Sequence, residues 1–194
     1  MRVRLLALPD FPMRPAIALI LLAVCAGALA DQHLHGDAAA PDPSQGCDTY
    51  TWNMAREFQL LTATPWSLQA LRTPDDDARW TPLDRRLEVM LAPATEVELL
   101  APPQHTEDAV QGHAGLMLLL VPRPSSYRIS SNQRVWIEVI GPQGPVQSTR
   151  FEMRTGCEKL VKSVVFPLQP DTRYWLQVSG SPVPDPVLLI TLDR

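Results

Sequence analysis

Cysteine is scarce in this chain of 194 residues: there are three, and no two of them form a C-x-x-C motif. A catalytic dithiol requires that close spacing and a setting that stabilises a thiolate, so the sequence gives no sign of redox catalysis. The chain also lacks the G-x-S-x-G, S-x-x-K and H-E-x-x-H motifs of common hydrolases. We therefore predict no catalytic residues.

Positive charge is also in short supply. The chain has 17 Lys and Arg against 21 Asp and Glu, which gives a formal net charge of −4 at pH 7. Sequence-independent binding to nucleic acid needs a basic surface, so this balance argues against a nucleic-acid partner. The acidic run at 75–77 lacks the alternating oxygen ligands and the glycine turn of a calcium loop, and we expect a solvated loop there.

The apolar run at residues 16–28 is shorter than the roughly 20 residues that a helix needs to span a bilayer. A positively charged stretch precedes it, and Ala28-Leu29-Ala30 supplies the small-x-small pattern that signal peptidase cleaves. We predict that residues 1–30 are a signal peptide cleaved after Ala30. The mature protein would then be periplasmic or secreted, with no transmembrane span. The alternative is that this segment is retained as an N-terminal anchor.

Cleavage after Ala30 would remove Cys25 and leave only Cys47 and Cys157. Exported compartments are oxidising, so two remaining thiols are expected to pair. We predict a structural disulfide between Cys47 and Cys157. It would close a loop on the order of 100 residues, worth up to about 4 to 5 kcal/mol in the chain-entropy model.

The mature chain divides into a short tail and one domain. Residues 31–46 hold almost no large apolar side chain, so they cannot build a core and are predicted to be a flexible tail. The ordered domain is expected at 47–194. It should begin with a helix capped by Thr51, in which Trp52 and Phe58 face the core while Glu57 points elsewhere. Thr64-Pro65 should end this helix.

Most of the remaining chain has the pattern of β-strands. Four segments alternate apolar and polar residues, as half-buried strands do: 85–91, 95–100, 134–140 and 173–179. Residues 116–121 are apolar throughout, which indicates a strand covered on both sides, and 187–192 should be the last strand. About eight or nine short strands with close turns predict an antiparallel β-sandwich or jelly roll with the helix packed on it. Cys157 should lie in a turn between strands.

Two tryptophans suggest a binding surface. Trp136 and Trp175 each lie opposite the main apolar set of their strand, next to Glu138 and Gln177. If the two strands are neighbours, the indoles could form a platform for a sugar or a peptide. The alternative is that the helix, with Trp52, covers that face.

The predicted new N-terminus suggests a metal site. In Asp31-Gln32-His33, a free α-amine, two backbone amides and the imidazole can form the square-planar nitrogen set that Cu(II) and Ni(II) prefer, and His35 could add a ligand. The tripeptide resembles amino-terminal copper- and nickel-binding motifs. The alternative is a tail with two incidental histidines and a protein without a cofactor.

An iron site is a further alternative. A non-haem iron dioxygenase of the homogentisate type holds its metal with two histidines and one carboxylate. His105 and His113, with Glu107 or Asp108, supply those residue types in a polar loop. Because nothing in that loop fixes them rigidly, solvated histidines are the competing interpretation.

Three strand-like segments resemble the small bacterial pre-peptidase C-terminal β-sandwich: Ser126-Tyr127-Arg128-Ile129, residues 134–139 and residues 173–179. The resemblance implies a jelly-roll module that accompanies secreted enzymes and has no catalytic residues. The acidic pair usual in that family is missing. The chain is also similar to stand-alone exported proteins of proteobacteria. We therefore expect an exported, non-catalytic binding or accessory protein, whose partner is a ligand or a periplasmic protein.

Overall fold

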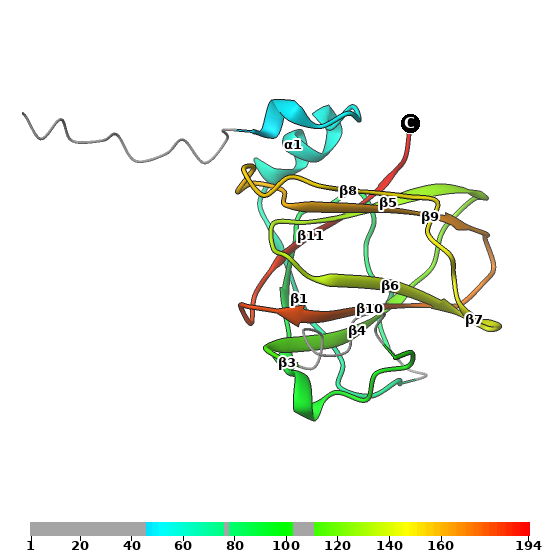
Figure 1. Cartoon of the computed structure of the whole chain (residues 1–194). Helices are drawn as coiled ribbons and strands as arrows, with labels where there is room; N and C mark the ends of the chain where they lie inside the picture. Colours follow the sequence, from blue (N-terminus) through cyan, green and yellow to red (C-terminus); the bar gives the residue numbers. More distant parts are fainter. Residues whose placement is uncertain (1–45, 76–77, 103–110) are drawn as a thin grey trace, which may run out of the picture. The chain divides into compact units, whose positions relative to one another are not determined.

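The computed structural model describes residues 46–75, 78–102 and 111–194. Most of their regular structure belongs to two β-sheets packed face to face (Figure 1). The first sheet has six strands in the order β1-β2-β11-β5-β9-β8, and the second has five in the order β3-β4-β10-β6-β7. Every pairing is antiparallel except that of β1 with β2. The prediction of a mainly β sandwich with one α-helix is confirmed, with eleven strands in place of eight or nine.

The strands of the six-stranded sheet are β1 (Trp66–Gln69), β2 (Leu87–Met90), β5 (Ser125–Ser131), β8 (Arg150–Met153), β9 (Lys162–Leu168) and β11 (Val187–Leu192). Those of the five-stranded sheet are β3 (Ala92–Pro93), β4 (His113–Leu119), β6 (Trp136–Gly141), β7 (Gly144–Pro145) and β10 (Tyr174–Ser181). One α-helix, α1 (Ala55–Leu61), and two 3-10 turns, η1 (Cys47–Thr49) and η2 (Ala94–Glu96), complete the described elements.

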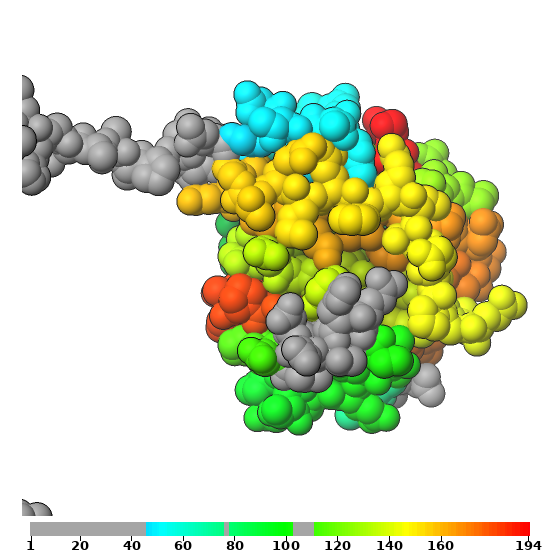
Figure 2. Space-filling model, viewed as in Figure 1, coloured from blue at the N-terminus to red at the C-terminus, as the bar shows by residue number. Residues whose placement is uncertain are grey.

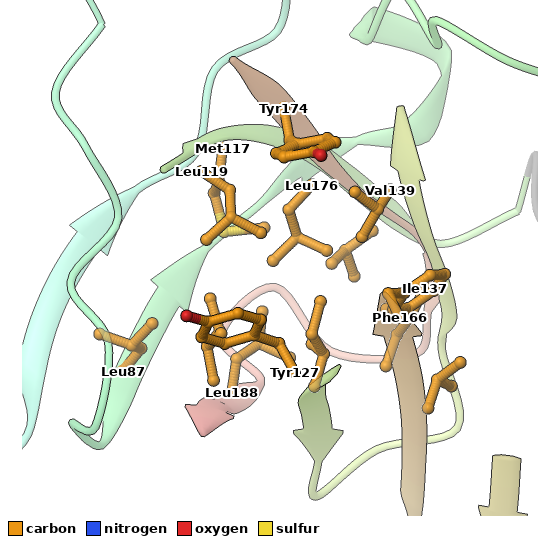
Figure 3. Close-up of a cluster of buried hydrophobic side chains, with 14 of the residues drawn as sticks. Leu87, Met117, Leu119, Tyr127, Ile137, Val139, Phe166, Tyr174, Leu176 and Leu188 are labelled. Atoms are coloured by element: carbon orange, nitrogen blue, oxygen red, sulfur yellow. The ribbon is translucent and has the colours of Figure 1, made fainter. Parts of the chain in front are cut away.

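The core lies between the sheets and is built by the alternating residues of each strand (Figure 3). Leu87, Tyr127 and Leu188 point inward from the six-stranded sheet, toward Leu176 and Val139 of the other. All five are at most 1% exposed. Burying a side chain of this size contributes about 1.5 to 3 kcal/mol, so the period-two pattern fixes which face of each strand turns inward.

The segment at 95–100 is not a strand, contrary to the prediction. It begins in η2 and then crosses the outer face of the five-stranded sheet. Its backbone bonds to a side chain: the Leu100 N–H donates to Gln177 Oε1 at 2.7 Å, and Gln177 Nε2 donates to the Ala101 carbonyl at 3.0 Å. The alternation of Val97 and Leu99 therefore reflects a half-buried covering segment rather than a strand in a ladder.

Strand β5 extends the strand-like segment 126–129 by one residue before it and two after it, and all three are serines. Ser125, Ser126, Ser130 and Ser131 all lie within it, between β11 and β9. On its outer face the Ser130 and Ser163 hydroxyls hydrogen-bond to each other at 2.7 Å. Buried serines are tolerated there because each finds a partner.

Helix α1 begins at Ala55, three residues later than predicted. Thr51 does not cap it: the Thr51 N–H and hydroxyl donate to the Glu152 carboxylate at 3.0 and 2.9 Å. Glu57, expected to point away from the core, is 1% exposed and faces the sheet. The helix covers the outer face of the six-stranded sheet, and so it does not cover the face that carries Trp136 and Trp175 (Figure 1).

The predicted disulfide is present. Cys47 is bonded to Cys157 with their Cα atoms 4.5 Å apart, across a sequence separation of 110. Cys157 lies in the turn between β8 and β9, as expected. Figure 2 shows the cyan N-terminal part of the described chain lying against the yellow and gold atoms of this region. No helix in the described part of the chain has the length and apolar character that crossing a membrane requires.

Candidate functional site

The sandwich is open along the side where β8 and β9 approach β6 and β7. Phe151 of β8 pairs with Val164 of β9, so both side chains lie on the inner face of their sheet. Val164 belongs to the core, whereas Phe151 is 68% exposed. The space between the layers therefore reaches solvent beside β8.

Two adjoining hollows occupy this opening, and we refer to them together as the Lys162 cleft. The first, with a volume of about 510 Å³, is lined by Arg134 and the second, of about 450 Å³, by Phe151. Trp136, Met153 and Lys162 line both. Sites for small molecules commonly enclose about 300 to 1,000 Å³, so each hollow is of that size.

Lys162 stands where the core ends. It has the same parity along β9 as the core residues Val164 and Phe166, and it is only 8% exposed. Its Nζ donates to the Val135 carbonyl at 2.9 Å and lies 4.5 Å from the centroid of the Trp136 ring. These two contacts hold a cation in place over an aromatic face.

Burial governs the electrostatics of this amine. It lowers the pKa of Lys162 from 10.5 to about 8, because the charged form loses hydration. Glu138 opposes this change in pKa, and Arg134 adds to it. A titratable group that is both buried and placed in a cleft is a candidate functional residue.

Gly112 lines the same hollow of the cleft as Arg134. Its φ of +69° lies in the left-handed region, and a Cβ there would come within 2.2 Å of the Ser181 carbonyl oxygen. Only glycine fits this close approach between two chain segments.

Trp136 and Trp175 lie on the same face of adjacent strands, which is the condition for the predicted platform, but far apart along them. Trp136 pairs with Ser179, and Trp175 pairs with Ile140. This register separates the indoles by four residues, or about 13 Å. Between them the fully buried Gln177 holds the covering segment at Leu100, so the rings do not share one platform.

Only Trp136 of this pair lines the Lys162 cleft. Trp175 is half-buried beside the Arg173 guanidinium, whose central carbon lies 5.4 Å from its ring centroid. The structure therefore gives the two predicted binding residues different surroundings.

The predicted metal ligands fall mostly outside the described residues. These are Asp31, Gln32, His33 and His35 of the tail site, and His105, Glu107 and Asp108 of the iron site. His113 is described: it opens β4, and its Nδ1 lies 3.4 Å from the Ser181 carbonyl oxygen. Within the described ranges, no group of three or more His, Cys, Asp or Glu residues could hold a metal ion.

A groove that the sequence analysis missed lies on another side of the sandwich. Trp66 of β1 and Trp80 line it, are 51% and 48% exposed, and enclose a volume of about 420 Å³. Its charged lining residues, Asp75 and Arg79, are exposed to solvent. The Lys162 cleft is the stronger candidate because it holds a buried charge. Trp66 opens the alternating strand β1 and Trp80 lies outside the named strands, so no local pattern pairs the two.

No protein-family model matches the chain, and no curated protein matches it either. The geometry of the Lys162 cleft therefore carries the functional inference.

Proposed function

We propose that this protein is exported to the periplasm or the cell exterior and there binds a small-molecule ligand in the Lys162 cleft without transforming it. The predicted signal peptide and the Cys47–Cys157 disulfide support an oxidising compartment. The resemblance to pre-peptidase C-terminal modules supports a non-catalytic or accessory role.

The observation that carries the proposal is the position of Lys162 over Trp136 in the lining of the cleft. Small-molecule sites combine apolar and aromatic walls with a few polar groups that fix the ligand's orientation. Trp136, Met153 and Phe151 supply the walls, and Lys162 supplies a positioned polar group. The hydrogen bond to Val135 keeps the ammonium in place, so a ligand need not order it.

The test is ligand binding observed at individual tryptophans. Protein labelled with 5-fluorotryptophan has five tryptophan positions to follow by fluorine NMR. A panel of aromatic acids and their primary amides, including indole-3-acetate and indole-3-acetamide, is titrated into it. We expect saturable shifts of the Trp136 resonance, assigned by Trp136→Phe, with little change at Trp175.

Two variants separate the cleft from the rest of the sheet face. Trp136→Ala should weaken binding at least about tenfold, because it removes an aromatic wall. Trp175→Ala, the matched change on the neighbouring strand, should leave affinity unchanged. If no member of the panel shifts Trp136 saturably, the proposed binding function is wrong.

The amino-terminal copper or nickel site stays a separate prediction. Mass spectrometry of the exported protein tests it directly, because any first residue other than Asp31 removes the α-amine that the chelate requires.

A further inference from the structure

The two hollows of the Lys162 cleft differ in charge. Arg134 and Lys162 line the first, and no acidic residue is among its described lining residues. Glu138 lines only the second. Two cations without a lining carboxylate give the Arg134 end a positive potential, which attracts an anion.

Lys162 and Arg134 both have N–H donors that make no hydrogen bond to the described residues. An ammonium carries three N–H donors, and Val135 provides the only hydrogen-bond acceptor for Lys162 among the described residues. Arg134 is exposed and makes no hydrogen bond or ion pair with them. Its guanidinium offers five further N–H donors in a planar fork. An acidic group between the two would bind donors that the described protein groups leave unused.

The other end of the cleft is apolar. Phe151 and Met153 of β8 line it together with the core residues Val164 and Phe166. An exposed phenylalanine beside a buried cation suits a ligand with an apolar body as well as a charge. Glu138 at this end repels a negative group, so the ligand's acidic end should turn toward Arg134.

We propose that the Lys162 cleft binds a small organic anion. Its acidic group lies between Lys162 and Arg134, and its apolar body lies along Trp136, Met153 and Phe151. This inference rests on the proposed binding function and adds the class of ligand. The shared chemistry is an acidic head group on a compact apolar or aromatic body, and a carboxylate is the form that the experiment uses.

The experiment compares two probes that differ in charge. Indole-3-acetate and indole-3-acetamide have nearly the same size and shape, but only the first is an anion at neutral pH. With both titrated against 5-fluorotryptophan protein, the acid should bind at least about tenfold more tightly, because hydrogen bonds to charged groups are the stronger ones. Inorganic phosphate, titrated as a competitor, tests whether the head group alone is sufficient; we expect it to compete weakly.

Variants assign the preference to the two cations. Lys162→Met should remove most of the acid's advantage over the amide, because it removes the charge that binds the carboxylate. Lys162→Arg should retain the advantage because it keeps the charge, which guards against a merely structural loss. Arg134→Gln should reduce the advantage in part. Lys159→Met, a change of an exposed lysine in the turn after Cys157, is the matched control and should have no effect.

The outcomes separate the two proposals. Equal affinities for the acid and the amide would contradict the proposal that the ligand is an anion, but not the proposed binding function. So would an acid preference that survives both Lys162→Met and Arg134→Gln. If neither probe nor any other panel member binds at Trp136, both the proposed binding function and the proposed class of ligand are wrong. Phosphate that displaces the acid at equal concentration would overturn the role of the apolar body.

Quenching of tryptophan fluorescence gives a second measurement without any organic ligand. Iodide and caesium are small ions of opposite charge that quench indole on contact. The Trp136 contribution, taken as the difference between the protein and Trp136→Phe, should be quenched more by iodide than by caesium. Lys162→Met should narrow that difference. Quenching that favours caesium would contradict a positive cleft.

Discussion

Arg128 of β5 donates a hydrogen bond of 3.1 Å to the carboxylate of Glu57 in α1, and the two side chains are 3% and 1% exposed. The same Arg128 nitrogen donates to the Asn53 carbonyl at 2.9 Å, and its second terminal nitrogen donates to Asp193 at 2.5 Å. The Thr191 hydroxyl donates to the Glu57 carboxylate. A buried ionic network therefore fixes the helix to the outer face of the six-stranded sheet.

Arg128→Met should strongly destabilise the protein. Removing one partner of a buried ion pair leaves the other charge without compensation, which typically costs about 3 to 5 kcal/mol. Glu57 would be left in that state, with the Thr191 hydroxyl as its one remaining hydrogen-bond partner among the described residues. The free energy of unfolding, measured by denaturant titration, should fall by that amount.

The matched control is Arg72→Met. Arg72 and Glu96 form an ion pair of 3.2 Å, but their side chains are 62% and 50% exposed. Exposed pairs of this kind are worth up to about 1 kcal/mol. An equal loss from Arg128→Met and Arg72→Met would show that the Arg128 network adds no stability of its own.

The elements predicted correctly are those in which local pattern and burial agree. Leu87 and Val89 alternate in the sequence and are both fully buried in the core. Glu57 shows where this reasoning fails: a charged residue on a helix is assigned to solvent unless a counter-charge is known. Its partner Arg128 lies 71 residues away, on strand β5. Only the tertiary pairing reveals it.

Of the two central residues of the candidate site, the sequence predicted Trp136 and not Lys162, for the same reason. Trp136 was singled out because it faces away from the core side of its strand. Lys162 was not, since a lysine before an apolar run resembles the boundary of a strand. Its parity with Val164 and Phe166 was the available signal. The contact with Trp136 depends on how β9 sits against the opposite sheet, which no local pattern specifies.

Replacing both Cys47 and Cys157 by serine should lower the free energy of unfolding by about 2 to 5 kcal/mol, because an open loop of this length gives the unfolded chain more freedom. The bond also joins the start of the described chain to the turn after β8. Denaturant unfolding of the double variant measures this loss of free energy. Mass spectrometry after alkylation of protein from its native compartment is the companion measurement. Alkylation of both cysteines without prior reduction would contradict a disulfide formed in the cell.

Tyr50 should make the protein sensitive to alkaline pH. Its hydroxyl donates to the Leu160 carbonyl at 2.7 Å, and burial raises its pKa from 10.0 to about 12. The folded state therefore retains a proton that the unfolded state loses. The resulting stabilisation is complete below pH 10 and is lost as pH rises through about 12.

Tyr50→Phe tests this assignment. The variant should lose about 1 kcal/mol at neutral pH with the hydrogen bond. Its free energy of unfolding should then fall less steeply than that of the parent protein above pH 10. Tyrosinate absorbance, compared between the two proteins, should show that one tyrosine ionises late. Parallel stability curves throughout the alkaline range would rule out Tyr50 as the source.

Lys162 should affect stability and binding in opposite ways as pH rises. Its pKa is lowered to about 8, so between pH 8 and 10.5 the unfolded state binds more protons than the folded one. The contribution of Lys162 to the free energy of unfolding therefore increases over that range. Affinity for indole-3-acetate should decrease over the same range, because the ammonium that binds the carboxylate is lost. Arg134 and Glu138 are the charged groups that act on the pKa of this amine.

The ratio of acid to amide affinity isolates this titration from other changes in the protein. It should be constant below pH 7 and fall toward a lower plateau above about 8, by up to about tenfold per pH unit. Lys162→Arg should hold the ratio constant to pH 10, because a guanidinium keeps its proton. Fluorine NMR titrations at a series of pH values provide both curves. If the ratio does not change between pH 7 and pH 10 in the parent protein, Lys162 does not bind the ligand's acidic group.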